Sequence, residues 1–501
     1  IAWRSWNGGL WGYDEAQKFV LSCQNWNADS KIIQQTWETA WAAIGLCNNV
    51  VYDLGQISPD AVGMSQEKIN SYIAEVRTLR AWAYYNIFEI WGGALPLNVS
   101  VSSEVPPSAD PDFDKSCKKI YDFIMTELDA SVDDLPKNEV NRMNQAANRI
   151  IKARLLLNSN IFIGEEHYTE CADLCQSIIN GDFGNYEIVS DYRKIYDINN
   201  NTCPEVIMAF AYGEPISKQD GWNCVCLAPS FDNSGTVLPT GGSEGAKCFL
   251  DAPYNDKLGA VYERFSDKDI RKKNYTCDDS GNYSGMFLKG AVKANYGTGE
   301  ALKADADRDG QNLVYVDQLG TFQNKGRDLE TVMSPRWGET NSGVRLIKYP
   351  LYHAATGYNF KDIDEVEFRL SEVVFMLAEC KMRAGDLNGG KELVNSVRKR
   401  YFSGADWNTE KDNPGRGFSS FDLDWMLNQW GQEFLGEGRR RRTDLRRFDK
   451  FTQGQWWFFG RTSETAFDLP AKRDRKYEWY PLPTSALKVN PGLVQNPNYV
   501  K

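Results

Sequence analysis

Apolar residues recur with the period of an α-helix in two long blocks of the chain, and an irregular region separates the blocks. The first block holds helical patterns at 33–44, 76–90, 117–128, 150–161 and 168–179, and the second holds patterns at 370–378 and 393–397. Short polar breaks such as "GEEHY" join successive patterns, as in antiparallel helix hairpins. The sequence therefore predicts a mainly α fold built from helix pairs.

The helix pairs are similar in length to tetratricopeptide (TPR) units, although a regular 34-residue period is missing, so we expect TPR-like pairs rather than an array. Between about 200 and 360, Gly, Asn, Asp, Ser and Pro become frequent and the apolar runs shorten. Aromatic residues persist there, which favours ordered loops with minor β structure over disorder. We predict one composite domain with a helical region at 1–200, a loop-rich excursion at 201–360 and a second helical region at 361–501.

Charge and cysteine content exclude several classes of partner. The net charge is −11, which disfavours binding to nucleic acid. The basic run "RRRRTDLRRF" at 439–448 is interleaved with Glu433, Glu437, Asp444 and Asp449, so we expect local ion pairs there. The 11 cysteines are odd in number and lack zinc spacing, which favours buried free thiols. The sequence contains no run of 18 apolar residues, so it predicts no transmembrane helix.

Three motifs indicate specific chemistry only weakly. "GGSEG" at 241–245 matches the nucleophile elbow of esterases, but prolines interrupt the strand and helix that an elbow needs. Asp305, Asp307 and Asp309 match the first half of a calcium loop, although position 12 of the loop is Val316 instead of Glu; a structural calcium is a tentative expectation. The 68 acidic residues include no local motif for the paired carboxylates of a glycoside hydrolase.

Six segments together resemble the SusD/RagB family of surface glycan-binding lipoproteins. They are "QTWETAWAAIGLCNNVV", "AEVRTLRAWAYYNIFEIWGGALPL", "ANRIIKARLLLNSNIFIG", "FRLSEVVFMLAECKMRAGD", "EFLGEGRRRRTDLRRF" and "YPLPTSALKVNPGLVQNPNY". These segments occur in the family's order from about residue 37 to 499. In the last segment Asn498 stands where the family usually has Gly.

The resemblance implies an α-helical fold of four TPR-like pairs carrying a loop-rich region, without catalysis or a required cofactor. It also implies partners: a glycan ligand, a SusC-like TonB-dependent transporter that receives the glycan, and the outer membrane. The lipid anchor would be attached at a cysteine upstream of the sequence given. On this reading Arg77 and Arg80 pack within the scaffold instead of contacting ligand.

Exposed aromatic rings are the natural groups for binding sugar, because they stack on the apolar faces of the rings while polar side chains bind the hydroxyls. The Gly-rich stretch "WRSWNGGLWGY" resembles an aromatic loop of the family. It provides Trp6, our first choice, with Asn7 as hydrogen-bond partner, then Trp11 and Trp3. The excursion adds Tyr283, Tyr296, Trp337 and Trp222, each among Gly and polar residues.

Three alternatives remain open at this point: a peptide-binding RagB-like protein, a glycoside hydrolase and a cytoplasmic TPR scaffold. The Trp-rich stretch near the N-terminus favours sugar over peptide. The sequence leaves open which glycan is bound.

Overall fold

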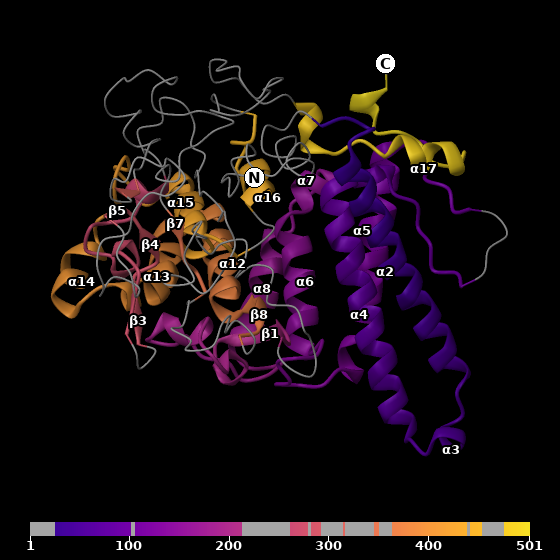
Figure 1. Cartoon of the computed structure of the whole chain (residues 1–501), viewed down its shortest axis with the longest axis horizontal. Helices are drawn as coiled ribbons and strands as arrows, with labels where there is room; N and C mark the ends of the chain where they lie inside the picture. The colour runs from indigo at the N-terminus through magenta and orange to yellow at the C-terminus, as the bar shows by residue number, and fades with distance from the viewer. Residues whose placement is uncertain are drawn as a thin grey trace.

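The computed structural model is built mainly from helices, and it describes residues 26–101, 106–212, 261–278, 282–291, 314–315, 345–349, 363–437, 441–452 and 475–500. The helices of residues 31–129 lie at one end of the molecule, and those of residues 387–433 lie at the other (Figure 1). The helices are α2 (Lys31–Gln56), α3 (Pro59–Val62), α4 (Gln66–Trp91), α5 (Phe113–Asp129), α6 (Gln145–Leu157), α7 (Ser159–Ile163), α8 (Tyr168–Ile179), α12 (Leu370–Arg383), α13 (Leu387–Arg398), α14 (Gly404–Glu410), α15 (Leu423–Glu433), α16 (Arg441–Arg447) and α17 (Thr484–Val489).

Successive helices pack in pairs: α2 against α4, α4 against α5, α6 against α8, and α12 against both α8 and α13. Polar residues start several of these helices by capping the free backbone N–H groups of the first turn. The Asp112 carboxylate accepts from the Lys115 amide at 3.1 Å, and the Asn144 side chain accepts from the Ala147 amide at 2.9 Å. The prediction of a mainly α fold of TPR-like helix pairs is confirmed. The domain boundaries stay a prediction.

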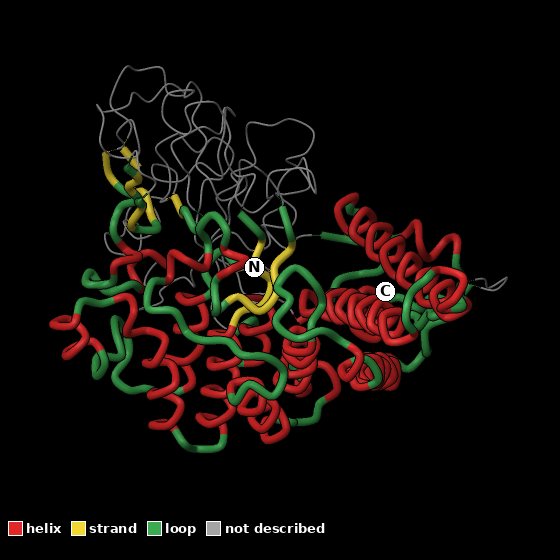
Figure 2. The backbone as a smooth tube through the Cα atoms, turned by 90° about the horizontal axis from the view of Figure 1, so that it is seen from below, coloured by secondary structure: helices red, strands yellow, loops and turns green. Residues whose placement is uncertain are grey.

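Short antiparallel strand pairs lie along one side of the helices (Figure 2). The longest pair joins β1 (Val206–Phe210) to β8 (Glu365–Arg369), with Val206 opposite Arg369 and Phe210 opposite Glu365. The other pairs are β2 (Thr276–Cys277) with β3 (Tyr283–Ser284), β4 (Phe287–Leu288) with β7 (Arg345–Leu346), and β5 (Gly290–Ala291) with β6 (Val314–Tyr315).

Helix α4 is the centre of the N-terminal half. Tyr84, Phe88 and Trp91 are fully buried on it. Its two arginines both bind one carboxylate of α5: Arg77 lies 2.7 Å and Arg80 2.5 Å from Glu127. The prediction that these arginines pack within the scaffold is confirmed.

The C-terminal segment returns to the N-terminal helices. The indole of Trp26 stacks on Tyr480 at a centroid distance of 4.2 Å, and its N–H donates to the Tyr499 hydroxyl at 3.1 Å. The Trp91 indole N–H donates to the Pro481 carbonyl at 3.0 Å. These contacts join the C-terminal segment to the N-terminal helices.

Seven cysteines lie in the described part of the chain, and all seven are free. Six of them are buried and Cys47 is half-buried, which confirms the prediction for these residues. In the same part of the chain, no helix is both long and apolar enough to cross a membrane.

Candidate functional site

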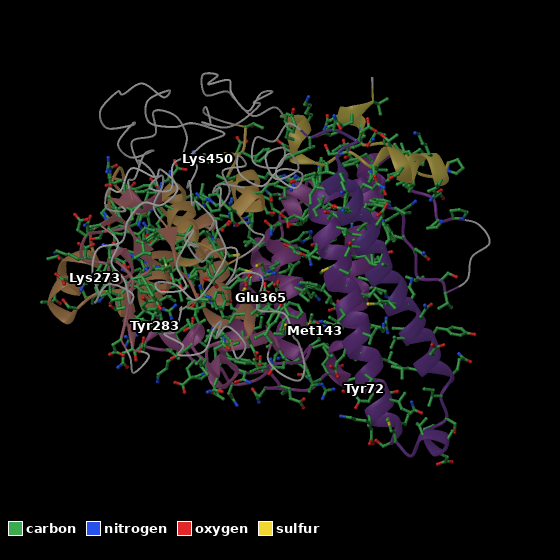
Figure 3. The ribbon with its side chains drawn as sticks, viewed as in Figure 1. Tyr72, Met143, Lys273, Tyr283, Glu365 and Lys450 are labelled. Atoms are coloured by element: carbon green, nitrogen blue, oxygen red, sulfur yellow. The ribbon has the colours of Figure 1, made fainter. Side chains whose placement is uncertain are left out.

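The structure describes one of the eight residues that the sequence predicts to contact a glycan. Tyr283 on β3 is 6% exposed, and its hydroxyl donates to the Arg193 carbonyl at 2.8 Å (Figure 3). A covered ring cannot stack on a sugar, so the expectation of an open ring at Tyr283 is corrected: it packs in a core cluster beside Tyr275, with ring centroids 6.1 Å apart. Trp3, Trp6, Asn7, Trp11, Trp222, Tyr296 and Trp337 lie outside the described residues.

The proposed calcium and esterase motifs also lie outside the described residues, namely Asp305, Asp307, Asp309 and the "GGSEG" stretch. Within the described part of the chain, no group of three or more His, Cys, Asp or Glu side chains is placed to hold a metal ion.

Strands β1 and β8 lie near the two ends of the excursion, and their pairing brings those ends together. Side-chain hydrogen bonds hold these points at Asp364. Its carboxylate accepts from the Tyr212 amide at 2.9 Å and from the Asn141 amide group at 2.7 Å. Asn200 donates to the Asp364 carbonyl at 2.9 Å and accepts from its amide at 3.0 Å. The base of the excursion is therefore fixed to the helical scaffold by hydrogen bonds.

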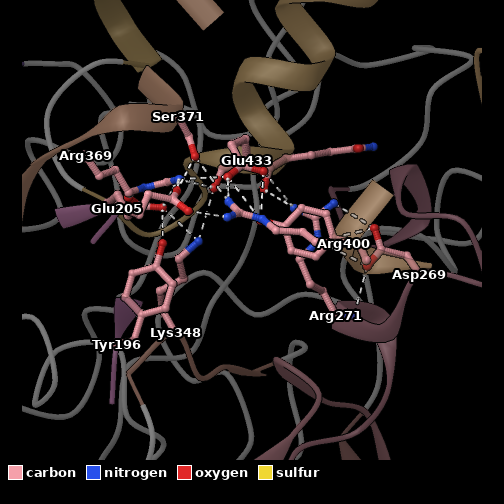
Figure 4. Close-up of polar contacts among 12 residues, drawn as sticks. Tyr196, Glu205, Asp269, Arg271, Lys348, Arg369, Ser371, Arg400 and Glu433 are labelled. Carbon is pink, nitrogen blue, oxygen red and sulfur yellow. Dashed lines mark hydrogen bonds and ion pairs between the residues drawn. The ribbon is translucent and has the colours of Figure 1, made fainter. Parts of the chain in front are cut away.

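A buried ionic network lies next to this base (Figure 4). Glu433 at the end of α15 accepts from Arg369 at 2.8 Å and from Arg400 at 2.7 Å. Glu205 pairs with the same two arginines, at 3.2 and 2.6 Å. Glu437 accepts from Arg369 at 2.7 Å. The network thus joins the residue before β1, the end of β8, the end of α15 and the turn after α13.

Cations also hold the carboxylates of this network in their ionised form. Burial acts to raise the pKa of Glu437, but Arg369 and Lys348 outweigh burial and lower it to about 2. Burial also acts to raise the pKa of Glu433, but Arg400 and Arg369 outweigh burial and lower that pKa. Such carboxylates keep their charge at every physiological pH and are poor proton donors.

A second buried network lies around α12. Glu379 is fully buried and accepts from Arg447 at 2.7 Å, from Arg383 at 2.8 Å and from the Trp430 indole at 2.8 Å. Arg154 of α6 lies 2.6 Å from Glu372 of α12. The pair of Arg154 with Glu372 ties an N-terminal helix to a C-terminal one.

A cavity of about 90 Å³ lies between the two networks. Its walls come from α4, α6, β8, α12, α15 and α16, and they include Glu89, Arg154, Glu365, Arg369, Glu372 and Arg447. A cavity of this volume can hold several water molecules. Pockets that hold small organic ligands are about 300 Å³ or larger. This junction cavity is therefore too small for a sugar ring.

Glu89 is the carboxyl group in this cavity with a pKa raised by burial. Raised carboxyl pKa values can indicate a general acid. Here, however, the carboxyl accepts a hydrogen bond from the Thr443 hydroxyl on α16. The described junction serves the scaffold and carries no catalytic arrangement among its described residues.

Sequence reasoning missed the partners in these networks. It expected Glu433 and Glu437 to pair with the arginines of 439–448, but the structure pairs them with Arg369, Arg400 and Lys348. The expected local pairing is seen between Arg447 and Asp444, at 2.9 Å. No local signal could reveal the distant partners, because they lie more than 30 residues away and meet through helix packing.

Comparison with protein families supports a single assignment. The model of the SusD family matches residues 191–499. The starch-binding protein SusD of Bacteroides thetaiotaomicron is 24% identical, over 98% of this chain and 83% of the relative. The SusD-like protein P25 of Formosa agariphila is 22% identical, over 93% of this chain and 78% of the relative.

Solved structures show the same fold over nearly the whole length. The surface glycan-binding protein A of Bacteroides uniformis superposes with a TM-score of 0.66 at 18% identity, covering 99% of this chain and 92% of that one. NanU of B. fragilis superposes with a TM-score of 0.61 at 17% identity, covering 99% and 89%.

Proposed function

Because the chain belongs to the SusD family, whose members bind carbohydrates and are not enzymes, we propose that it captures glycans at the outer-membrane surface. It passes the captured glycan to a SusC-like TonB-dependent transporter. An N-terminal lipid anchor holds it at the membrane. The family match over residues 191–499 is the observation that carries this proposal.

The scaffold supports the proposal on physical grounds. Helix pairs joined by buried ion pairs form a stiff base, and loops on a stiff base are suited to ligand binding. The β1–β8 pair fixes both ends of the excursion to that base. In this proposal the glycan stacks on Trp6, with Asn7 as hydrogen-bond partner, and on further rings at Trp3, Trp11, Trp222, Tyr296 and Trp337.

Affinity electrophoresis through gels that contain plant, host or fungal polysaccharides tests the proposal. We expect retardation in at least one gel. Trp6→Ala should weaken binding to that glycan by tenfold or more, because a stacking ring is lost, and should leave the melting temperature within a few degrees of wild type. A tenfold change in Kd corresponds to about 1.4 kcal/mol.

Tyr52→Ala is the matched control, since Tyr52 is an exposed ring on α2, 53% accessible, outside the proposed site. It should migrate like wild type in every gel. Equal loss of affinity in both variants, or retention of peptides without retention of any glycan, would contradict the proposal.

The transporter is tested separately. Full-length protein carrying an affinity tag, extracted from outer membranes in mild detergent, should copurify with a TonB-dependent transporter. Purification of the protein alone, with glycan binding intact, would contradict delivery and leave glycan binding in place.

A further inference from the structure

A second cavity, of about 320 Å³, lies at the end of the molecule opposite α2 and α4, among α13, α14 and α15 (Figure 1). Its volume falls within the range of pockets that hold small organic ligands. It is separate from the junction cavity, and no residue lines both. The lining is Arg264, Phe265, Ser266, Asp269, Arg398, Phe402, Glu410, Asn413, Pro414, Gly415, Arg416, Gln429 and Gln432.

Arg398, the last residue of α13, is the unusual member of this lining. It is 7% exposed, and its guanidinium makes one hydrogen bond, to the side-chain oxygen of Asn395 at 2.8 Å. Among the described residues no carboxylate lies within ion-pair distance of it, and its other N–H groups have no hydrogen-bond partner. Burial lowers the pKa of Arg398 to about 10, so the group still carries its charge at neutral pH. A buried cation without a paired anion is costly.

Asp269 and Glu410 attract the Arg398 charge from a distance, but other cations lie closer to both carboxylates. Asp269 binds Arg271 at 2.7 Å, and the Glu410 carboxylate lies 3.9 Å from the Lys268 ammonium. Among the described residues of the lining, Arg398 is therefore a guanidinium with no carboxylate within ion-pair distance. This arrangement favours a carboxylate over a neutral or zwitterionic ligand.

The rest of the lining suits a ligand that carries hydroxyl groups. Gln429 is 3% exposed, and its amide makes no hydrogen bond with the described residues. Ser266 and Asn413 add a hydroxyl and an amide to the wall, and the ring of Phe402 adds an apolar surface. Amide and hydroxyl groups beside an aromatic ring are the groups that bind a sugar ring.

We propose that this cavity binds a small carboxylate of single-sugar size, such as a hexuronic acid, with the carboxylate on Arg398 and hydroxyl groups on Gln429. The site is distinct from the aromatic residues of the proposed glycan site, and the inference does not depend on that proposal. It would give the protein a second ligand, recognised by charge.

Isothermal titration of the full chain with sodium D-glucuronate tests the inference, and D-glucose serves as the uncharged ligand of matched size. We expect D-glucuronate to bind with a 1:1 stoichiometry and D-glucose to bind at least tenfold more weakly. Arg398→Met should weaken D-glucuronate binding at least tenfold. Lys399→Met removes the same charge from the next residue, which is exposed, and should bind like wild type.

The melting temperature separates a binding role from a structural one. Arg398 has no ion-pair partner, and its guanidinium lies 5.6 Å from the Trp425 ring centroid and 6.0 Å from those of Phe402 and Trp407. Arg398→Met keeps an apolar side chain against these rings and should therefore change the melting temperature by only a few degrees. Gln429→Leu, a second variant that keeps the charge, should weaken D-glucuronate but not sodium acetate. The inference is overturned by absence of D-glucuronate binding, by equal binding of D-glucose, or by unchanged binding in Arg398→Met. Trp6→Ala should leave D-glucuronate binding unchanged, so failure here and failure of the proposed glycan site are distinguishable.

Discussion

Glu433 is 2% exposed and accepts hydrogen bonds from Arg369, Arg400 and Tyr401. A buried carboxylate with such partners stabilises the fold only while every partner is in place, because each buried charge needs its counterpart. The arginines depend on Glu433 as much as it depends on them. At the scale of the residue, this network acts as a cooperative unit.

Glu433→Gln should therefore reduce the free energy of unfolding by about 3–5 kcal/mol, the usual cost of removing one partner of a buried pair. Urea denaturation followed by circular dichroism measures the change. Asp424→Asn is the control on the same helix: Asp424 is exposed and lies 2.9 Å from Lys450. An exposed pair contributes about 1 kcal/mol or less. Equal losses in the two variants would contradict the role assigned to the buried network.

Close helix contacts depend on glycine at the turn after α4. A Cβ built on Gly93 would lie 2.0 Å from the Phe113 carbonyl oxygen at the start of α5 and 3.1 Å from the Cys117 sulfur. Backbone cannot move away as a flexible side chain can. At the scale of the element, Gly93 sets how closely α5 approaches the end of α4.

Gly93→Ala should lower the melting temperature by several degrees, because α5 must shift away from α4. Gly45→Ala is the matched control: Gly45 lies inside α2, and nothing lies within 4 Å of its Cβ position. Alanine there should be neutral or stabilising by about 0.5–1 kcal/mol, because glycine is unfavourable inside a helix. Differential scanning calorimetry of both variants checks the prediction. A Gly93→Ala protein as stable as wild type would show that the turn has room for a side chain.

At the scale of the whole molecule, buried carboxylates paired with cations make the stability of the fold depend on pH. Cations lower the pKa of Glu379, Glu433 and Glu437, against the effect of burial. A carboxyl whose folded pKa is lowered stabilises the fold above its unfolded value of about 4.5 and loses that contribution as the pH falls. Burial raises the pKa of Glu89, so this carboxyl has the opposite effect on how stability changes with pH.

The free energy of unfolding should therefore fall as the pH decreases from about 4.5 toward 2. Glu437, whose pKa is about 2, accounts for about 3 kcal/mol of that loss at 1.36 kcal/mol per pKa unit. Urea denaturation at several pH values from 7 to 3 measures the slope. Glu437→Gln should show a shallower slope, since it has no proton to gain at that position. The same slope in both proteins would contradict the assignment to Glu437.

The long helices and the family could be predicted from local sequence patterns. Apolar residues at helical spacing indicate which face of a helix is buried, because that signal is local. The ordered motifs identified the SusD family and the packing role of Arg77 and Arg80. The free state of the described cysteines also followed from their positions on apolar faces.

Tertiary structure alone decided which charges meet and which rings are covered. Glu433 and Glu437 find their cations in distant segments, and Tyr283 is buried although Gly and polar residues surround it in the sequence. The cavity at Arg398 depends on the same kind of long-range packing, since α13, α14 and α15 build it together. Burial and ion pairing depend on contacts between segments far apart in the chain, and local sequence patterns carry no record of those contacts.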